Sequence, residues 1–280
     1  MNAGTPTASP KLTKMHPPYD IEIAIQDYEF HKRAWWMLSS IVQTQPWDGH
    51  QPPKIRVSIS THANDSYPEL LERMIDSFGS EIPLRVDRYR DENFFFRGHT
   101  RNQDIKCCES EWLLFSDSDM VFHPQFFAHL HAAHLPGYRG TGKLLTAPRH
   151  NIPVNAAYDL ADGEDYMSGP VEDAFGRCWE HRSSYSARGR SPGAGYFQLL
   201  ETSWLHEREI IYSDRNSDRP ISSGRGNKFF SDRHFRRKLE GVVALKCPPD
   251  ENGFRDVLKP ILHMNHTRKR DGENWRPVCH

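Results

Sequence analysis

The sequence lacks the features that mark membrane proteins and strongly charged proteins. It contains no apolar run near the roughly 18 residues that a membrane-spanning helix requires, and its mean hydropathy is −0.74. Lys and Arg total 36 against 37 Asp and Glu, a formal net charge of −1. Because the charges balance, neither bulk electrostatic binding to nucleic acid nor an acidic solvating chain is indicated.

Cysteine is too sparse to build a scaffold. The chain has five cysteines, an odd number with irregular spacing and no Cys-x-x-Cys motif, so neither a disulfide framework nor a cysteine zinc site is indicated. Residues 1–18 are rich in Thr, Pro, Lys and Ala and lack the apolar stretch of a secretory signal. We therefore expect a flexible leader there and a cytoplasmic protein.

Strand and helix patterns alternate from Asp20 onward. Ile21, Ile23 and Ile25 recur with the period of two that is typical of a strand, and apolar residues between 34 and 42 recur with helical spacing. This alternation predicts an α/β fold with a mostly parallel sheet flanked by helices, whose ligands bind beyond the carboxyl ends of the strands. The predicted strands are residues 21–26, 55–59, 82–86 and 112–115, and the predicted helices are residues 34–42, 70–78 and 98–111.

The second half of the chain is less regular. Residues 151–195 are polar and rich in Gly, Pro and Ser, which predicts loop and short helix, a lid or acceptor-binding insertion. Residues 196–200, 209–212 and 242–245 are predicted to be later strands.

Two carboxylates directly follow the apolar strand at residues 112–115. Asp117 and Asp119 would lie close together at its carboxyl end, where two negative charges are costly unless a cation lies beside them. Mg²⁺ and Mn²⁺ prefer carboxylate oxygens and keep positions open for phosphate. The alternative is a solvent-facing turn that caps the next helix.

Two enzyme families use such a carboxylate pair. The segment Asp117-Ser-Asp-Met-Val fits the D-x-D-x-V motif of haloacid-dehalogenase-like (HAD-like) phosphatases, in which the first carboxylate is the nucleophile. That motif belongs to the first strand of the phosphatase core, but three strand–helix units precede it here, and the later Gly-Asp-x-x-x-Asp motif is missing. The phosphatase is therefore the weaker alternative.

More of the chain resembles a GT-A fold glycosyltransferase, family 2-like. Residues 20–126 resemble its nucleotide-sugar half: residues 97–102 are similar to the "G-x-x-R-N" segment, and residues 116–126 are similar to "D-x-D-M-x-F-x-P-x-F". The resemblance implies a Rossmann-like GT-A fold in a single large domain. It also implies a donor-binding half at residues 19–126 and an acceptor-binding, catalytic half at residues 127–280.

The second half carries weaker similarities to the same family. Residues 193–198 resemble the glycine-rich strand "G-x-x-Y-F-Q", in which Gly195 would let the backbone approach the donor sugar. Residues 230–235 resemble "E-D-x-D-F" with Ser231 in place of Glu, and Asp232 stands at the acceptor-activating carboxylate. Residues 261–268 resemble a C-terminal strand that gives a histidine to the metal. His263 and His266 would point to opposite faces of a strand, and the family pattern favours His266.

The resemblance implies transfer of a sugar from a nucleoside diphosphate donor to an acceptor hydroxyl of unknown class. A UDP-sugar is the favoured donor. Mn²⁺ or Mg²⁺ would be held by Asp117, Asp119 and His266, and Asp232 would act as general base in an inverting displacement. A retaining mechanism stays open. The implied donor-binding residues are Asp27, Tyr28, His62, Asp65, Arg97, Arg101, Asp117 and Gly195.

Two further alternatives stay open. The first is a non-catalytic glycan- or nucleic-acid-binding module on a transferase fold, because Ser231 departs from the family pattern and the C-terminal part is rich in Arg. The second is a nucleotidyltransferase, but residues 26–30 stand where its glycine-rich loop would be.

Overall fold

The structure is a computed structural model of the 280-residue chain. It describes residues 17–94, 97–166, 168–183, 196–212, 235–245, 259–265, 268–271 and 274–277. The predicted leader at residues 1–18 lies almost entirely outside this part of the chain.

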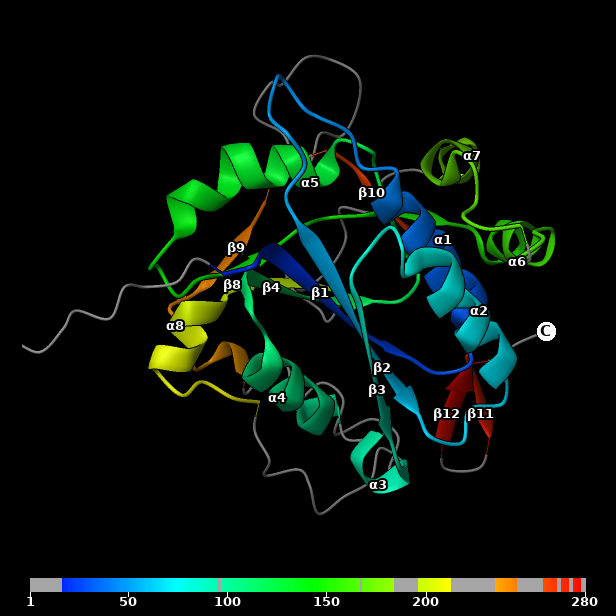
Figure 1. Cartoon of the computed structure of the whole chain (residues 1–280), viewed down its shortest axis with the longest axis horizontal. Coiled ribbons are helices and arrows are strands. Elements are labelled where there is room, and N and C mark those ends of the chain that lie inside the picture. The colour runs from blue at the N-terminus through cyan, green and yellow to red at the C-terminus, as the bar shows by residue number, and fades with distance from the viewer. Residues whose placement is uncertain are drawn as a thin grey trace, which may run out of the picture.

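A seven-stranded sheet, in the order β3-β2-β1-β4-β8-β6-β9, forms the centre of the molecule (Figure 1). The strands β3, β2, β1 and β4 are parallel, β8 is antiparallel to both β4 and β6, and β9 is parallel to β6. The predicted α/β fold with a mostly parallel sheet is therefore confirmed. The strands are β1 (Tyr19–Asp27), β2 (Ile55–His62), β3 (Leu84–Tyr89), β4 (Ser110–Asp117), β6 (Leu144–Thr146), β8 (Phe197–Glu201) and β9 (Val242–Ala244).

Helices cover both faces of this sheet (Figure 1). On one face α1 and α2 pack on the isoleucines of β1, and α6 and α7 contact α1 from outside. On the other face α4 and α8 pack on Ala24, Leu113 and Phe115. The helices are α1 (His31–Val42), α2 (Pro68–Phe78), α3 (Asp91–Phe94), α4 (Arg97–Cys107), α5 (Phe126–His129), α6 (Val154–Asp162), α7 (Ala174–Glu180) and α8 (Thr202–Glu207), with a π-helical turn at Leu130–His134 and a 3-10 turn at Leu135–Tyr138. Among these helices, none combines the length and apolar character that crossing a membrane requires.

A small second sheet closes over the end of β4. It has the order β5-β10-β7, with β5 (Met120–Phe122), β10 (Ile261–Met264) and β7 (His150–Ile152). The strand β10 runs antiparallel to β5 and parallel to β7. A separate two-stranded ribbon joins β11 (Arg268–Asp271) to β12 (Asn274–Pro277).

A buried ionic network fastens α4 to the centre of the sheet. The Glu22 carboxylate is fully buried, and it lies 2.5 Å from Nη2 of Arg56 and 3.2 Å from Nη1 of Arg85. It also accepts a hydrogen bond from Ser58. Arg85 reaches Asp104 on α4 at 2.8 Å. Since a buried charge is tolerated only when it is paired and hydrogen-bonded, these contacts fix the packing of α4.

Three element predictions need correction. The helix predicted over residues 98–111 ends at Cys107, and β4 already begins at Ser110. In the region predicted as loop and short helix, the described residues within 151–183 contain the short helices α6 and α7 as predicted, but also the end of the strand β7, which was not predicted. The strand predicted at residues 209–212 does not form, because Glu209 has a φ of 51° and the side chain of Asn102 bonds both backbone groups of Tyr212.

Candidate functional site

Some of the predicted site residues lie where three parallel strands end. In the register of the sheet Gln26 lies opposite Asp117, and Asp27 lies opposite Thr61. The carboxyl ends of β1, β2 and β4 therefore form one edge, the edge at which α/β sheets bind ligands.

The loop at residues 117–119, which we call the DSD loop, is held by two later strands. The backbone N–H of Asp117 donates to the carbonyl of Tyr196, just before β8, at 3.4 Å. The backbone N–H of Met264 in β10 donates to the carbonyl of Asp119 at 2.9 Å. Asp119 is 3% exposed. These contacts hold the second carboxylate of the motif in a fixed, buried position.

His263 is the side chain that meets this carboxylate. Its Nε2 lies 3.1 Å from Oδ2 of Asp119, and its Nδ1 lies 3.2 Å from Oδ1 of Asn151 in β7. The amide oxygen of Asn151 accepts a hydrogen bond from protonated Nδ1, which leaves Nε2 facing the carboxylate. An imidazole nitrogen and a carboxylate oxygen this close together can ligate the same cation. The residues therefore fit a divalent metal with mixed nitrogen and oxygen ligands.

A buried imidazole joins the ends of β1 and β2. Nδ1 of His31, in the first turn of α1, lies 2.5 Å from Asp27, and its Nε2 lies 2.9 Å from Asp65. The side chains of His31 and Asp27 are 0% exposed and that of Asp65 is 4% exposed. Burial alone would lower the pKa of His31, but the two carboxylates outweigh it and raise the pKa to about 10.

The same contacts act on Asp65. Burial works to raise the pKa of this carboxyl, but hydrogen bonds from His31 and from the backbone N–H of Tyr67 lower it below its usual range. Asp27, His31 and Asp65 thus form a carboxylate–imidazolium–carboxylate unit, in which both carboxylates are covered by protein.

Three rings lie next to this unit. The Tyr28 and His62 ring centroids are 5.4 Å apart, and Phe94 of α3 lies 5.6 Å from Tyr28 and 5.4 Å from His62. The structure therefore brings together Asp27, Tyr28, His62 and Asp65, four of the residues that the resemblance implies for donor binding, with Tyr28 the half-buried member of the ring group.

Arg101 is buried in contacts with protein. Its Nη1 donates to Oε1 of Gln198 at 3.0 Å and to the hydroxyl of Tyr212 at 2.5 Å, and its guanidinium stacks on Phe115. It is 4% exposed. This side chain ties α4 to β8, the strand next to the DSD loop.

Some predicted site residues lie wholly or partly outside the part of the chain that the structure describes. Gly195, Asp232 and His266 lie outside the described residues. Arg97 opens α4, and only its backbone is described.

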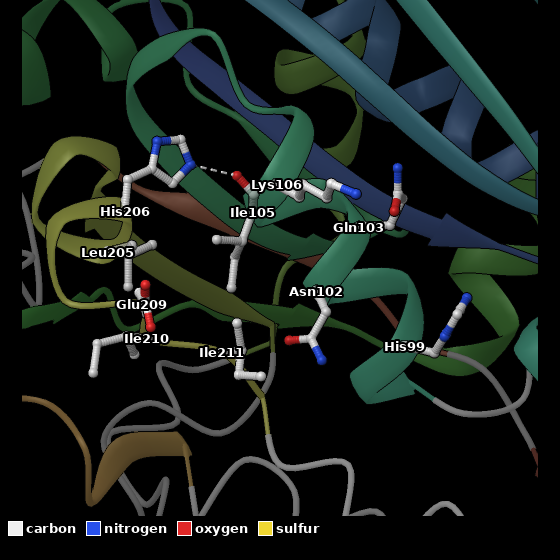
Figure 2. Close-up of a pocket in the computed structure, with 10 residues that line it drawn as sticks. All are labelled: His99, Asn102, Gln103, Ile105, Lys106, Leu205, His206, Glu209, Ile210 and Ile211. Carbon is white, nitrogen blue, oxygen red and sulfur yellow. Dashed lines mark hydrogen bonds between the residues drawn. The ribbon is translucent and has the colours of Figure 1, made fainter.

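Two other features lie away from this edge. A groove of about 600 Å³ runs between α4 and α8, and Figure 2 shows His206 of α8 bonded to the carbonyl of Ile105 in its wall, at 2.7 Å. Asp20, Glu111 and His131 lie close enough together to hold a metal ion. That group stands at the opposite end of the strands from the DSD loop, and Arg139 already pairs with Glu111.

Sequence reasoning missed two of the contacts that organise the site. His31 stands four residues after Asp27, a spacing that predicts contact only within a helix, whereas Asp27 ends a strand. Asn151 carries no signal in the sequence, because its contact with His263 depends on the pairing of β7 with β10.

Comparison with known proteins supports the fold. No protein-family model and no curated protein matches the chain. The solved structure of S. aureus TarS 1–349 in complex with UDP-GlcNAc matches with a TM-score of 0.50 and 13% identity, over 91% of this chain and 60% of that chain. A mannosyltransferase, PcManGT from Pyrobaculum calidifontis, in complex with GDP-Man and Mn²⁺, matches with a TM-score of 0.46 and 12% identity, over 84% of this chain and 56% of that chain.

The likeness to TarS establishes the architecture. The chain has the GT-A glycosyltransferase fold that its motifs predicted. It spans about 60% of the TarS chain that it matches. What the chain does with this fold depends on its own site residues.

Proposed function

We propose that this protein is a metal-dependent glycosyltransferase that moves a sugar from a nucleoside diphosphate donor to an acceptor hydroxyl. The observation that carries the proposal is the contact between Asp119 and His263 at the carboxyl end of β4. In a GT-A fold this is the edge where the donor binds. The TarS structure in complex with UDP-GlcNAc supports a UDP-sugar as the donor.

The ligands proposed for Mn²⁺ or Mg²⁺ are Asp117, Asp119 and one histidine. The resemblance implies His266, while the contact with Asp119 supports His263. Asn151 holds the proton of His263 on Nδ1 and leaves Nε2 for the ligand role. A bound divalent ion would neutralise the charge that develops on the leaving diphosphate.

In this proposal the two halves of the chain bind different substrates. Residues 19–126 bind the donor, and residues 127–280 bind the acceptor. On the donor side, Tyr28 would contact the base. The Asp27–His31–Asp65 unit would hold the ends of β1 and β2 in place next to Tyr28. Arg97, which opens α4, is proposed for the diphosphate, and Gly195 for the sugar. Arg101, buried against Gln198 and Tyr212, is proposed instead to hold α4 against β8 beside the site.

Asp232 is proposed as the general base of an inverting displacement. Its carboxylate would take the proton of the acceptor hydroxyl as the hydroxyl oxygen attacks the anomeric carbon. The bond from that carbon to the diphosphate oxygen breaks with the electron pair staying on the nucleoside diphosphate.

The alternatives differ in strength. The GT-A fold leaves no basis for the phosphatase, because the strand that carries the DSD loop is the fourth in the chain and lies between β1 and β8. A binding module on this fold is distinguished by experiment, since it would bind a glycan or nucleic acid regardless of metal.

Calorimetry of UDP with and without Mn²⁺ tests the proposal. We expect the wild type to bind UDP only with the metal, and Asp119→Asn to weaken that binding by at least about tenfold. Asp76→Asn is the matched control, because Asp76 is an exposed aspartate on α2. Asp232→Asn should keep UDP binding and lose transfer. Equal UDP affinity with and without Mn²⁺ would contradict the proposal.

A further inference from the structure

Arg149 is a half-buried guanidinium beside the DSD loop. It lies between β6 and β7, stacks 4.0 Å from the ring centroid of Tyr196, and has Nη1 3.7 Å from the sulfur of Met120. Within the described residues no carboxylate pairs with it. By contrast, the guanidinium of Arg33 donates to two backbone carbonyls at 2.6 and 2.9 Å.

The sheet order fixes the side of the site on which Arg149 stands. The strands β1 and β2 lie on one side of β4, and β8 and β6 lie on the other. Tyr196 directly precedes β8 and Arg149 follows β6. The DSD loop therefore separates Arg149 from the Asp27–His31–Asp65 unit, where the nucleoside is proposed to bind. Arg149 faces the part of the site left for the acceptor.

The guanidinium group of Arg149 is suited to bind an anionic ligand. A guanidinium presents a planar fork of donors that matches carboxylate and phosphate oxygens, and stacking on an aromatic ring fixes the plane of that fork in advance. The backbone of Tyr196 is anchored to Asp117, so the ring beneath Arg149 is placed relative to the DSD loop. A half-buried cation without a carboxylate partner raises the free energy of the folded protein unless a ligand supplies a negative charge.

We propose that Arg149 binds a phosphate or carboxylate group of the acceptor, so that the acceptor is an anionic sugar or sugar phosphate rather than a neutral one. This inference rests on the proposed function. Arg149 then acts as a specificity-determining residue, and Tyr196 positions it.

The test uses the full chain saturated with UDP and Mn²⁺. Glucose, glucose 6-phosphate and glucuronate are titrated in separately, so that the neutral, phosphate and carboxylate probes are compared on the same complex. We expect the wild type to bind at least one anionic probe more tightly than glucose. Arg149→Gln should weaken that binding by about tenfold or more, the loss expected for a charge-assisted hydrogen bond, and Arg149→Lys should weaken it less.

The UDP affinity of each variant is the internal control. Arg149→Gln should bind UDP with Mn²⁺ as the wild type does, which also shows that the variant folds. Arg208→Gln is the matched control, because Arg208 also stacks on an aromatic ring, that of Trp204 at 4.7 Å, but near α8. It should leave every affinity unchanged.

The outcomes separate the two proposals. If Arg149→Gln weakens UDP binding as strongly as Asp119→Asn, Arg149 serves the donor diphosphate and the inference is wrong. It is also wrong if the wild type binds neither anionic probe more tightly than glucose. If the wild type binds no UDP with Mn²⁺, the proposed function fails, and this inference fails with it.

Discussion

The imidazolium of His31 should make the stability of the fold fall at alkaline pH. His31 is fully buried between Asp27 and Asp65, and its pKa in the folded chain is about 10 against an ordinary 6.5. The perturbation is His31→Gln, which retains a polar side chain of similar reach but carries no charge at any pH.

The sign and size follow from the two pKa values. A group whose pKa is raised by folding contributes stability that is complete below its unfolded pKa of 6.5 and is lost as the pH rises through about 10. Each unit of pKa difference corresponds to about 1.4 kcal/mol. The full contribution of His31 at pH 6 is therefore about 5 kcal/mol, and it declines by at most about 1.4 kcal/mol per pH unit.

Urea denaturation of both proteins between pH 5 and pH 10 measures this contribution. The free energy of unfolding of the wild type minus that of His31→Gln reports the charged imidazole together with its effect on its two carboxylate partners, because the remaining titrating groups are the same in both chains. The difference should be largest at pH 5 to 6 and should shrink steadily above 6.5. A difference that stays constant from pH 6 to pH 10 would refute the assignment of a charged His31.

Three other substitutions should change stability in predictable ways. Glu22→Gln should cost about 3 kcal/mol in urea denaturation, because it removes the buried carboxylate that the half-buried Arg56 and Arg85 share. Gly142→Ala should cost about 2 kcal/mol, since a Cβ there would lie 2.2 Å from the Trp204 ring and the φ is +62°, whereas Gly137→Ala, with nothing within 4 Å, should be close to neutral. Leu114→Ala should lower the free energy of unfolding by about 3 kcal/mol, because Leu114 of β4 is 0% exposed and its truncation leaves a cavity. For Glu22→Gln or Leu114→Ala, a loss below about 1 kcal/mol would contradict the packing around that residue.

Local patterns in the sequence predict the donor half of the fold well. The alternation at residues 21–26 and the helical spacing at 34–42 and 70–78 are local signals, and the first three βα units depend mainly on them. The motif at Asp117 and Asp119 could be placed at a strand end because a continuous apolar run precedes it.

Contacts between distant residues set what the sequence could not predict. Residues 210–212 are a short apolar run of the kind found in strands, but the side-chain amide of Asn102 bonds the backbone groups of Tyr212. The ring of Tyr212 stacks on Phe235 with ring centroids 3.9 Å apart. His263 and His266 are equivalent as a local pattern. Only the pairing of β10 with β5 places His263 beside Asp119. Arg149 carries no motif, and its position depends on the order of β8 and β6 in the sheet.

The bracing of Asp119 by β10 makes the order of synthesis matter for assembly of the site. Arg33 of α1 donates to the carbonyl of Met264, 231 positions later in the chain, and β10 then supplies the backbone bond and the histidine that hold Asp119. A ribosome-bound chain that has not yet exposed β10 has every parallel strand of the donor half but an unbraced DSD loop. Asp119 can therefore be braced only after residues 261–264 have been synthesised and have left the ribosome.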